Sequence, residues 1–304
     1  MLVIRGVVPV VPTPFHPDES IDFESFRKVV DWIAGSNLAG MCLPAYGSEF
    51  YKLSDIERDE LVSSAIEVCG GRVPVIAQAN HTSTRLASQL ARRYEAMGAD
   101  AVSVAIPRQF GASTYDILKH CETIASAVAC PVLVQDFNPG GSAIDAEFVV
   151  ELSNRCDNFQ FVKFEDPMMI DKILSIRDQL DGRVAILEGW GGLYMLEGIS
   201  AGIVGVMPGA AIADLLGKVF SVADSGDSVA AYELFGSLLP FINFMFQDFE
   251  MFLWIEKRTL VRRGLIKSET VRALTRTPSS SVVAHVDHLI DQIERIRVSQ
   301  NLGQ

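Results

Sequence analysis

The sequence predicts an α/β protein, a (β/α)8 TIM barrel with an all-helical C-terminal extension. Short apolar runs alternate with longer amphipathic stretches through about the first 226 residues, the alternation repeats eight times, and it stops after that point. Eight strand–helix units are typical of a closed parallel barrel, whereas doubly wound sheets usually contain fewer. We therefore expect residues 1–226 to form the barrel and residues 227–304 the extension.

Each predicted strand is a short run rich in β-branched residues, and each predicted helix has a period near 3.6. The predicted strands are Gly6–Pro12, Gly40–Leu43, Val73–Ala77, Ala101–Val104, Pro131–Val134, Phe159–Lys163, Val184–Leu187 and Ile203–Val206. The predicted barrel helices are Phe23–Ser36, Asp55–Cys69, Ser83–Met97, Thr114–Val128, Asp145–Asn154, Met168–Leu180, Gly192–Ser200 and Ala213–Ala223. The predicted extension helices are Val229–Phe246, Phe249–Arg263 and Ser281–Val298.

Composition limits the class of partner. Hydrophobic residues make up 49% of the 304 residues, enough for a large core, and the formal net charge of −12 argues against binding nucleic acid. The apolar start of the chain is broken by Pro9, Pro12 and Pro14, so we expect no membrane span. Five scattered cysteines without C-x-x-C or metal-ligand spacing favour a reducing compartment, the cytoplasm, and no metal site.

Lys163 lies in an apolar run that predicts a buried strand. Burial disfavours the charged ammonium, and a neutral amine can attack a carbonyl to form a Schiff base. The alternative is a lysine with a buried stem whose head reaches water or pairs with Glu165 or Asp166.

The carboxyl ends of the strands carry the active site in this fold. Polar or glycine-containing segments follow the predicted strands at Pro12–Pro14, Ala45–Glu49, Gln78–His81, Ile106–Gln109, Gln135–Phe137, Lys163, Glu188–Gly189 and Met207–Gly209. Lys163 therefore falls at the functional end of the sixth strand, which favours the catalytic interpretation.

These segments together resemble the dihydrodipicolinate synthase/N-acetylneuraminate lyase superfamily. The resemblance rests on the opening Gly6–Phe15, the Ser48-Glu49 turn after strand two, Val162-Lys163, Glu188-Gly189, and Gly202–Gly205. It covers essentially the whole chain, and it implies a (β/α)8 barrel with Lys163 as the lysine that condenses with a 2-keto acid. It also implies a homo-oligomer, a dimer or a tetramer, for which the apolar extension helices give a second reason, and it requires no cofactor.

Several positions depart from the dihydrodipicolinate synthases. Tyr46 and Gly47 stand where those proteins have two threonines, and Gln135 stands where they have a proton-shuttling tyrosine. A primary amide cannot act as an acid or base near pH 7. The tyrosine after strand four and the arginine beyond strand five are also missing, with Arg108-Gln109 and Gly140–Ser142 in their places. Dihydrodipicolinate synthesis remains an alternative, but these departures disfavour it.

The chain is most similar to the 2-keto-3-deoxyarabonate dehydratase branch of the superfamily. The shared positions are Ala45, Ser48, Glu49, His81, Gln135, Asp136, Lys163, Glu165, Leu187, Glu188 and Gly189. The resemblance implies dehydration of a 2-keto-3-deoxy sugar acid, with a pyruvate-releasing aldolase or a non-catalytic metabolite-binding paralogue as alternatives.

We expect Lys163, Gln135, His81 and Glu188 to carry catalysis. Tyr46, Gly47, Ser48, Gly189 and Pro208 are the expected substrate-binding residues, with the backbone N–H groups of the first three on the substrate carboxylate. Local structural roles compete with these interpretations: His81 and Ser48 can each satisfy a helix or turn, and Glu188 can be a buried paired carboxylate. Glu49 is expected to accept backbone donors beneath the site, and the Phe-rich segment Phe241–Phe249 is expected to serve packing or an interface rather than a ligand.

Overall fold

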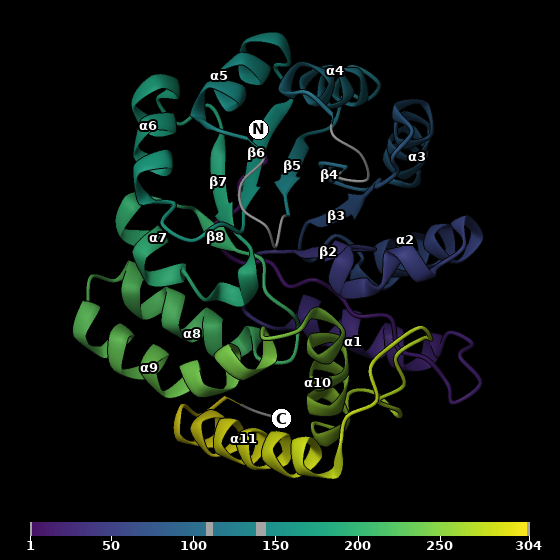
Figure 1. Cartoon of the computed structure of the whole chain (residues 1–304), viewed down its shortest axis with the longest axis vertical. Helices are drawn as coiled ribbons and strands as arrows, with labels where there is room; N and C mark the ends of the chain where they lie inside the picture. Colours follow the sequence, from purple (N-terminus) through teal and green to yellow (C-terminus); the bar gives the residue numbers. More distant parts are fainter. Residues whose placement is uncertain (1, 108–111, 138–143, 303–304) are drawn as a thin grey trace.

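The computed structural model describes residues 2–107, 112–137 and 144–302. The predicted positions Arg108-Gln109 and Gly140–Ser142 lie outside these residues. Eight parallel strands form one sheet in the order β1-β8-β7-β6-β5-β4-β3-β2 (Figure 1). The strands are β1 Gly6–Val7, β2 Met41–Leu43, β3 Val75–Gln78, β4 Ala101–Ala105, β5 Val132–Asp136, β6 Phe159–Phe164, β7 Ala185–Glu188 and β8 Gly205–Val206.

The chain beyond β1 closes the sheet into a barrel. Val10 bridges Cys42 of β2 on one side and Gly209 after β8 on the other. The Val11 N–H donates to Cys42 O at 2.9 Å, and the Cys42 N–H donates to Pro9 O at 3.0 Å. The predicted (β/α)8 barrel is confirmed.

Helices surround the barrel, and each follows its strand as predicted (Figure 1). They are α1 Phe23–Gly35, α2 Asp55–Cys69, α3 Thr84–Met97, α4 Thr114–Ala125, α5 Ala146–Arg155, α6 Ile170–Leu180, α7 Met195–Ala201 and α8 Ala213–Asp224. Local sequence sets their starts. In α2, for example, Ser54 and Glu57 form a reciprocal capping box, in which each side chain accepts from the other's backbone N–H.

Strand alternation separates the barrel interior from the layer beneath the helices. Leu133, Phe161 and Leu187 pack inside the barrel together with Val8, Cys42, Ile76 and Met207. Their strand neighbours Val134 and Val162 point outward into the layer under the helices. Successive side chains of a strand point to opposite faces, so every second residue beyond Phe161 and Leu133 also faces the barrel axis.

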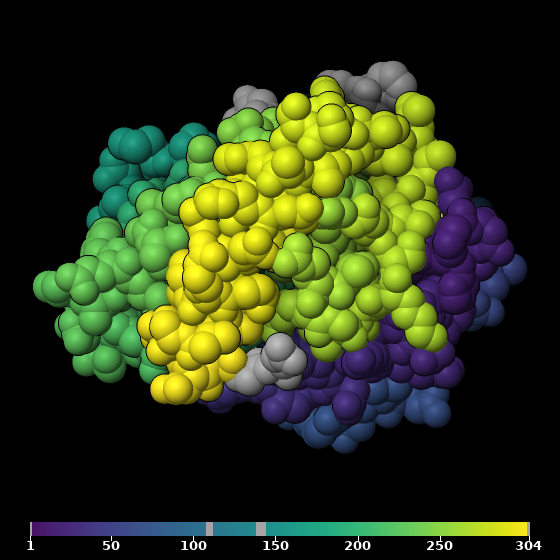
Figure 2. All heavy atoms as spheres, turned by 90° about the horizontal axis from the view of Figure 1, so that it is seen from below, coloured from purple at the N-terminus to yellow at the C-terminus, as the bar shows by residue number. Residues whose placement is uncertain are grey.

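The extension consists of three helices, α9 Ser228–Met245, α10 Phe249–Arg262 and α11 Ser280–Ser299. Helix α9 packs against α8, α10 and α11. Figure 2 shows α11, in yellow, lying across this face of the molecule. The predicted division between residues 226 and 227 falls in the short connection between α8 and α9, and whether the two parts are separate domains stays a prediction.

Within the described residues, α9 is the one helix long and apolar enough to cross a membrane by length and composition. It contains Pro240, and its side chains Ala231, Phe235, Leu238, Phe241, Ile242 and Met245 are buried within the protein. The helix therefore contributes to the core.

A buried ion pair fastens the extension to the barrel. Glu49, in the turn after β2, contacts Nζ of Lys257 in α10, and both side chains are essentially inaccessible to water. The second Glu49 oxygen accepts the Arg272 N–H at 3.1 Å and lies 3.4 Å from Nζ of Lys52. The expectation that Glu49 accepts a backbone donor therefore agrees with the structure, and burial lowers the pKa of Lys257 to about 8 despite this carboxylate.

We predict that Glu49→Gln destabilises the protein by about 3–5 kcal/mol, because Lys257 loses the partner of a buried charge. The matched control is Glu24→Gln, which removes the exposed pair of Glu24 with Lys267. An exposed pair contributes only about 1 kcal/mol or less. Urea unfolding measures both changes, and equal losses in the two variants would show that the buried pair has no special role.

Candidate active site

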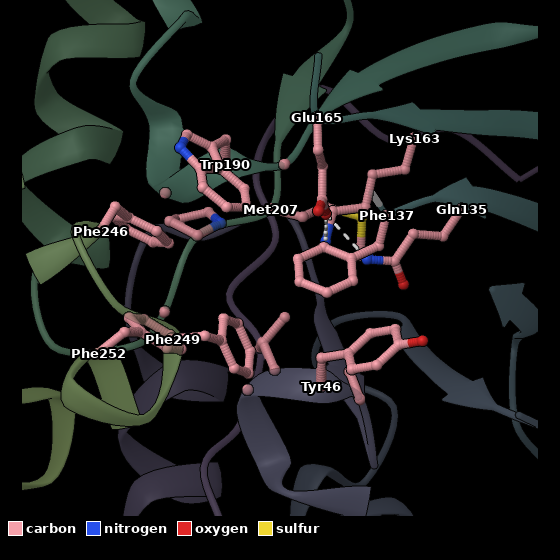
Figure 3. A pocket seen from close by; sticks show the side chains of 17 residues that line it. Tyr46, Gln135, Phe137, Lys163, Glu165, Trp190, Met207, Phe246, Phe249 and Phe252 are labelled. Carbon is pink, nitrogen blue, oxygen red and sulfur yellow. Dashed lines mark hydrogen bonds and ion pairs between the residues drawn. The ribbon is translucent and has the colours of Figure 1, made fainter. Parts of the chain in front are cut away.

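A cavity lies at the carboxyl ends of the strands, closed on one side by the extension. Lys163 and Gln135 line it together with Tyr46, Gly47, Gly189 and Pro208 (Figure 3). The remaining lining residues are Val10, Ala45, Phe137, Glu165, Trp190, Gly191, Met207, Gly209, Phe246, Phe249 and Phe252. Six of the nine residues expected at the site from the sequence thus come together at one cavity.

The alternation of β5 and β6 explains why Lys163 and Gln135 meet. Lys163 lies two residues after the interior Phe161, and Gln135 lies two residues after the interior Leu133, so both face the barrel axis. The two residues are also directly paired in the sheet register. Glu165 continues the same face of β6 two residues beyond Lys163.

Lys163 and Glu165 form a buried ion pair. Nζ of Lys163 lies 2.8 Å from Oε1 of Glu165, and the two residues are 5% and 7% exposed. The pairing expected under the alternative interpretation of Lys163 is therefore present, with Glu165 as the partner. Asp166, the other candidate, pairs with Lys172 instead. Only an unprotonated amine attacks a carbonyl, and the Glu165 carboxylate lies within hydrogen-bond distance of this amine.

Gln135 belongs to a chain of hydrogen bonds that ends at this pair. Its Nε2 donates to Oε1 of Glu165 at 2.8 Å. Its Oε1 accepts from Nε2 of Gln78, an interior residue of β3. Figure 3 shows the side chains of Gln135, Lys163 and Glu165 pointing toward one another. The amide of Gln135 is thus engaged in fixing the orientation of the Glu165 carboxylate.

Two glycines leave room for buried carboxylates at the cavity wall. A Cβ at Gly189 would lie 2.2 Å from Oε1 of Glu165, and a Cβ at Gly209 would lie 2.4 Å from Oε2 of Glu256. Oε1 of Glu256, in α10, accepts the Ala211 N–H at 2.9 Å and so holds the segment after β8. Burial raises the pKa of Glu256 to about 7. Both positions require glycine, because a carboxylate oxygen lies where any other residue would place its Cβ.

Three of the expected site residues do not line the cavity. The Ser48 hydroxyl donates to Val11 O at 2.6 Å and accepts the Ala45 N–H at 3.0 Å, so it holds the turn after β2. The Ser48 N–H donates to Ala45 O at 3.0 Å. Nδ1 of His81 accepts the N–H of Ser83, the residue that caps α3. In the structure, Ser48 therefore stabilises a turn and His81 the start of a helix, the two local structural roles named above as alternatives.

Glu188 is the third expected residue that does not line the cavity, because the alternation of β7 turns its side chain away. It follows the interior Leu187, so its side chain points away from the barrel axis, whereas Gly189 returns to the cavity side. Glu188 is fully buried, and its Oε1 accepts the Tyr194 N–H at 3.4 Å. Burial raises the pKa of Glu188 to about 8, and the nearby charge of Glu165 adds to the rise.

An aromatic wall faces the Lys163–Glu165 pair. Phe137 lies between that pair and Tyr46 in Figure 3, with ring centroids 4.4 Å from Tyr46, 5.4 Å from Phe249 and 6.0 Å from Trp190. Phe246, Phe249 and Phe252 also line the cavity. The expectation that the Phe-rich segment serves packing rather than a ligand site is therefore incomplete, because its end reaches the cavity.

The cavity is small in this arrangement, with a volume of about 40 Å³. Phe137 and Trp190 form part of its wall. Within the described residues, no group of three or more His, Cys, Asp or Glu side chains is arranged to hold a metal ion. The polar chemistry available is an amine, a carboxylate and an amide in direct contact.

The model of the dihydrodipicolinate synthetase family matches residues 3–292. The chain belongs to this family. Its members include synthases and a dehydratase, all of them lyases, and we accordingly describe this protein as a lyase. The family's barrel fold agrees with the architecture described above.

Three relatives illustrate the range of the family. The L-2-keto-3-deoxyarabonate dehydratase of Azospirillum brasilense is 30% identical over 275 residues, which cover 88% of this chain and 87% of that protein. A crystal structure of dihydrodipicolinate synthase from Rhodopseudomonas palustris is 25% identical, with a TM-score of 0.88 and coverage of 95% and 97% of the two chains. The third, YagE of E. coli K12 in complex with pyruvate, is 22% identical with a TM-score of 0.85, and it covers 95% of this chain and 98% of its own.

Proposed function

We propose that this lyase dehydrates a 2-keto-3-deoxy sugar acid through a Schiff base on Lys163. The observation that carries the proposal is the position of Lys163, an amine at the carboxyl end of β6 that faces a cavity and contacts a carboxylate. The similarity to an L-2-keto-3-deoxyarabonate dehydratase supports the reaction type. The pyruvate complex of YagE supports a 2-keto acid as the ligand class.

The proposed reaction begins with attack of the Lys163 Nζ on the C2 carbonyl. Loss of the carbonyl oxygen as water leaves an iminium, which withdraws electrons from C3 and makes its proton acidic. Loss of that proton gives an enamine. The electron pair of the enamine then forms the C3–C4 double bond and expels the C4 hydroxyl, which takes up a proton and leaves as water. Hydrolysis of the remaining iminium frees Lys163 and the product.

The substrate carboxylate is proposed to bind at the turn after β2. The Ser48 N–H donates to Ala45 O, and Gly47 and Tyr46, which lie on the cavity wall, are proposed to take this role. Gly189 and Pro208 line the opposite part of the wall. Ser48, His81 and Glu188 do not line the cavity, and we propose that they position residues that do.

Dehydration is preferred to aldol cleavage because of where protons must move. Cleavage of C3–C4 needs a base at the C4 hydroxyl, which in the synthases is linked to the tyrosine at the position of Gln135. The Gln135 amide cannot take a proton, and it is already bonded to Glu165 and Gln78. Dehydration instead needs its base at C3, the atom next to the carbon that bonds to Lys163.

We also propose a cytoplasmic homo-oligomer, a dimer or tetramer. The described free cysteines support a reducing compartment. The apolar faces of the extension helices are buried within the chain, so they give less support to an oligomer than the sequence suggested. Exposed apolar side chains elsewhere, among them Leu86 on α3, Tyr115 on α4 and Leu174 on α6, offer surface for subunit contacts.

We predict that borohydride with pyruvate attaches the reduced three-carbon acid to Lys163, and that Lys163→Ala abolishes this adduct. Lys172→Ala is the matched control, since Lys172 also pairs with a carboxylate but does not line the cavity. Peptide mass spectrometry locates the adduct, and circular dichroism checks that the variants fold. An adduct that persists in Lys163→Ala, or that maps to another lysine, would refute the proposed nucleophile.

We predict that a 2-keto-3-deoxy pentonate or hexonate loses one water and keeps its carbon chain. The product is a dicarbonyl acid, because the new C3–C4 alkene rearranges toward the end that carries the remaining hydroxyl. Mass spectrometry after incubation distinguishes the outcomes. Release of pyruvate and a shorter aldehyde would instead identify an aldolase, and condensation of pyruvate with aspartate semialdehyde would identify a dihydrodipicolinate synthase.

A further inference from the structure

Glu165 is the titratable side chain in direct contact with the reacting nitrogen. Its Oε1 lies 2.8 Å from Nζ of Lys163 and accepts from Nε2 of Gln135 at 2.8 Å. Its Oε2 is buried and has no hydrogen-bond partner among the described residues. A buried carboxylate oxygen without a partner is costly, so its retention in a cavity calls for a function.

Other side chains near the lysine are less suited to take a proton from the substrate. Gln135 is an amide and has no acidic or basic form near pH 7. Glu188 points away from the barrel axis and does not line the cavity. The Tyr46 hydroxyl does not point toward Lys163 in Figure 3.

We propose that Glu165 is the acid–base catalyst of this site and replaces the tyrosine that Gln135 has displaced. This inference rests on the proposed Schiff base at Lys163. In the free enzyme, Glu165 accepts a proton from the Lys163 ammonium, which frees the amine to attack C2. That proton then leaves with the carbonyl oxygen as water, so the carboxylate is restored when the iminium forms.

The same carboxylate then acts on the substrate carbon. Once Nζ of Lys163 is bonded to C2, the next carbon, C3, lies two bonds from Nζ. Glu165, which contacts Nζ in the free enzyme, is therefore within reach of the C3 proton. The carboxylate takes the C3 proton, the C3–H electrons form the enamine, and Glu165 becomes a carboxylic acid. It gives this proton to the C4 hydroxyl as the C4–O bond breaks, so one water leaves and the carboxylate is regenerated. No oxidant, metal or further reactant is needed.

Gln135 and Gly189 have positioning roles in this account. The Gln135 amide holds Oε1 of Glu165 and leaves Oε2 without a hydrogen bond. Gly189 provides the space in which the carboxylate sits, because any Cβ there would overlap it. Glutamine in place of tyrosine at position 135 thus removes the tyrosine hydroxyl as an acid–base group, and it orients the Glu165 carboxylate instead.

Proton exchange on pyruvate tests the inference without any sugar acid. In D2O, an enzyme that forms the iminium and removes the C3 proton replaces the methyl hydrogens of pyruvate with deuterium, which NMR follows. We predict that Glu165→Gln lowers this exchange rate by about 100-fold or more, the usual effect of losing a general base. The borohydride adduct of Glu165→Gln at equilibrium should remain within a few-fold of wild type.

Asp166→Asn is the matched control, because Asp166 neighbours Glu165 but pairs with Lys172. It should exchange pyruvate at nearly the wild-type rate. Glu165→Ala provides a second, independent variant, in which added formate should restore exchange as a replacement carboxylate. Formate should not restore exchange in Lys163→Ala.

The outcomes separate this inference from the function on which it rests. Wild-type exchange by Glu165→Gln would overturn the inference, and so would a folded variant that loses adduct and exchange together, since Glu165 would then only position Lys163. A wild-type enzyme that forms no adduct would instead overturn the proposed Schiff base. A wild-type enzyme that exchanges pyruvate but cleaves sugar acids would overturn dehydration and leave the role of Glu165 at C3 supported.

Discussion

The contact between Lys163 and Glu165 is the interaction on which the rest of the site depends. Two side chains of opposite charge type are buried at the mouth of an apolar barrel, and further hydrogen bonds reduce the cost of burying such a pair. Gln135 and Gln78 supply hydrogen bonds from neighbouring strands, and Gly189 supplies space. The barrel below fixes the spacing, because each of these residues extends an interior row already set by Ile76, Leu133, Phe161 or Leu187.

The extension completes the site as well as the fold. Helix α10 is held to the barrel by Lys257 on Glu49 and by Glu256 on the Ala211 N–H. The same helix carries Phe249 and Phe252, which line the cavity opposite the lysine. A packing interaction between barrel and extension therefore also determines the shape of the substrate space.

Much of the fold was predictable, because the alternation of strand and helix patterns is a strong signal over eight repeats. The position of Lys163 was predictable from its apolar strand, and that of Gln135 from the adjacent strand end. Glu188 does not line the cavity, and period-two alternation from Leu187 already pointed its side chain outward. Applied to Phe161, Lys163 and Glu165, the same rule would have identified Glu165. The contributions of Phe249 and Phe252 were not accessible from the sequence, because they depend on how α10 packs across the barrel mouth.

A crystal structure of the enzyme after borohydride reduction with pyruvate tests the account most directly. We predict continuous density from Nζ of Lys163 to C2 of the ligand, with a Glu165 carboxylate oxygen about 3–3.5 Å from the ligand methyl carbon. An adduct whose methyl carbon faces away from Glu165, or pyruvate bound without a bond to Lys163, would contradict it.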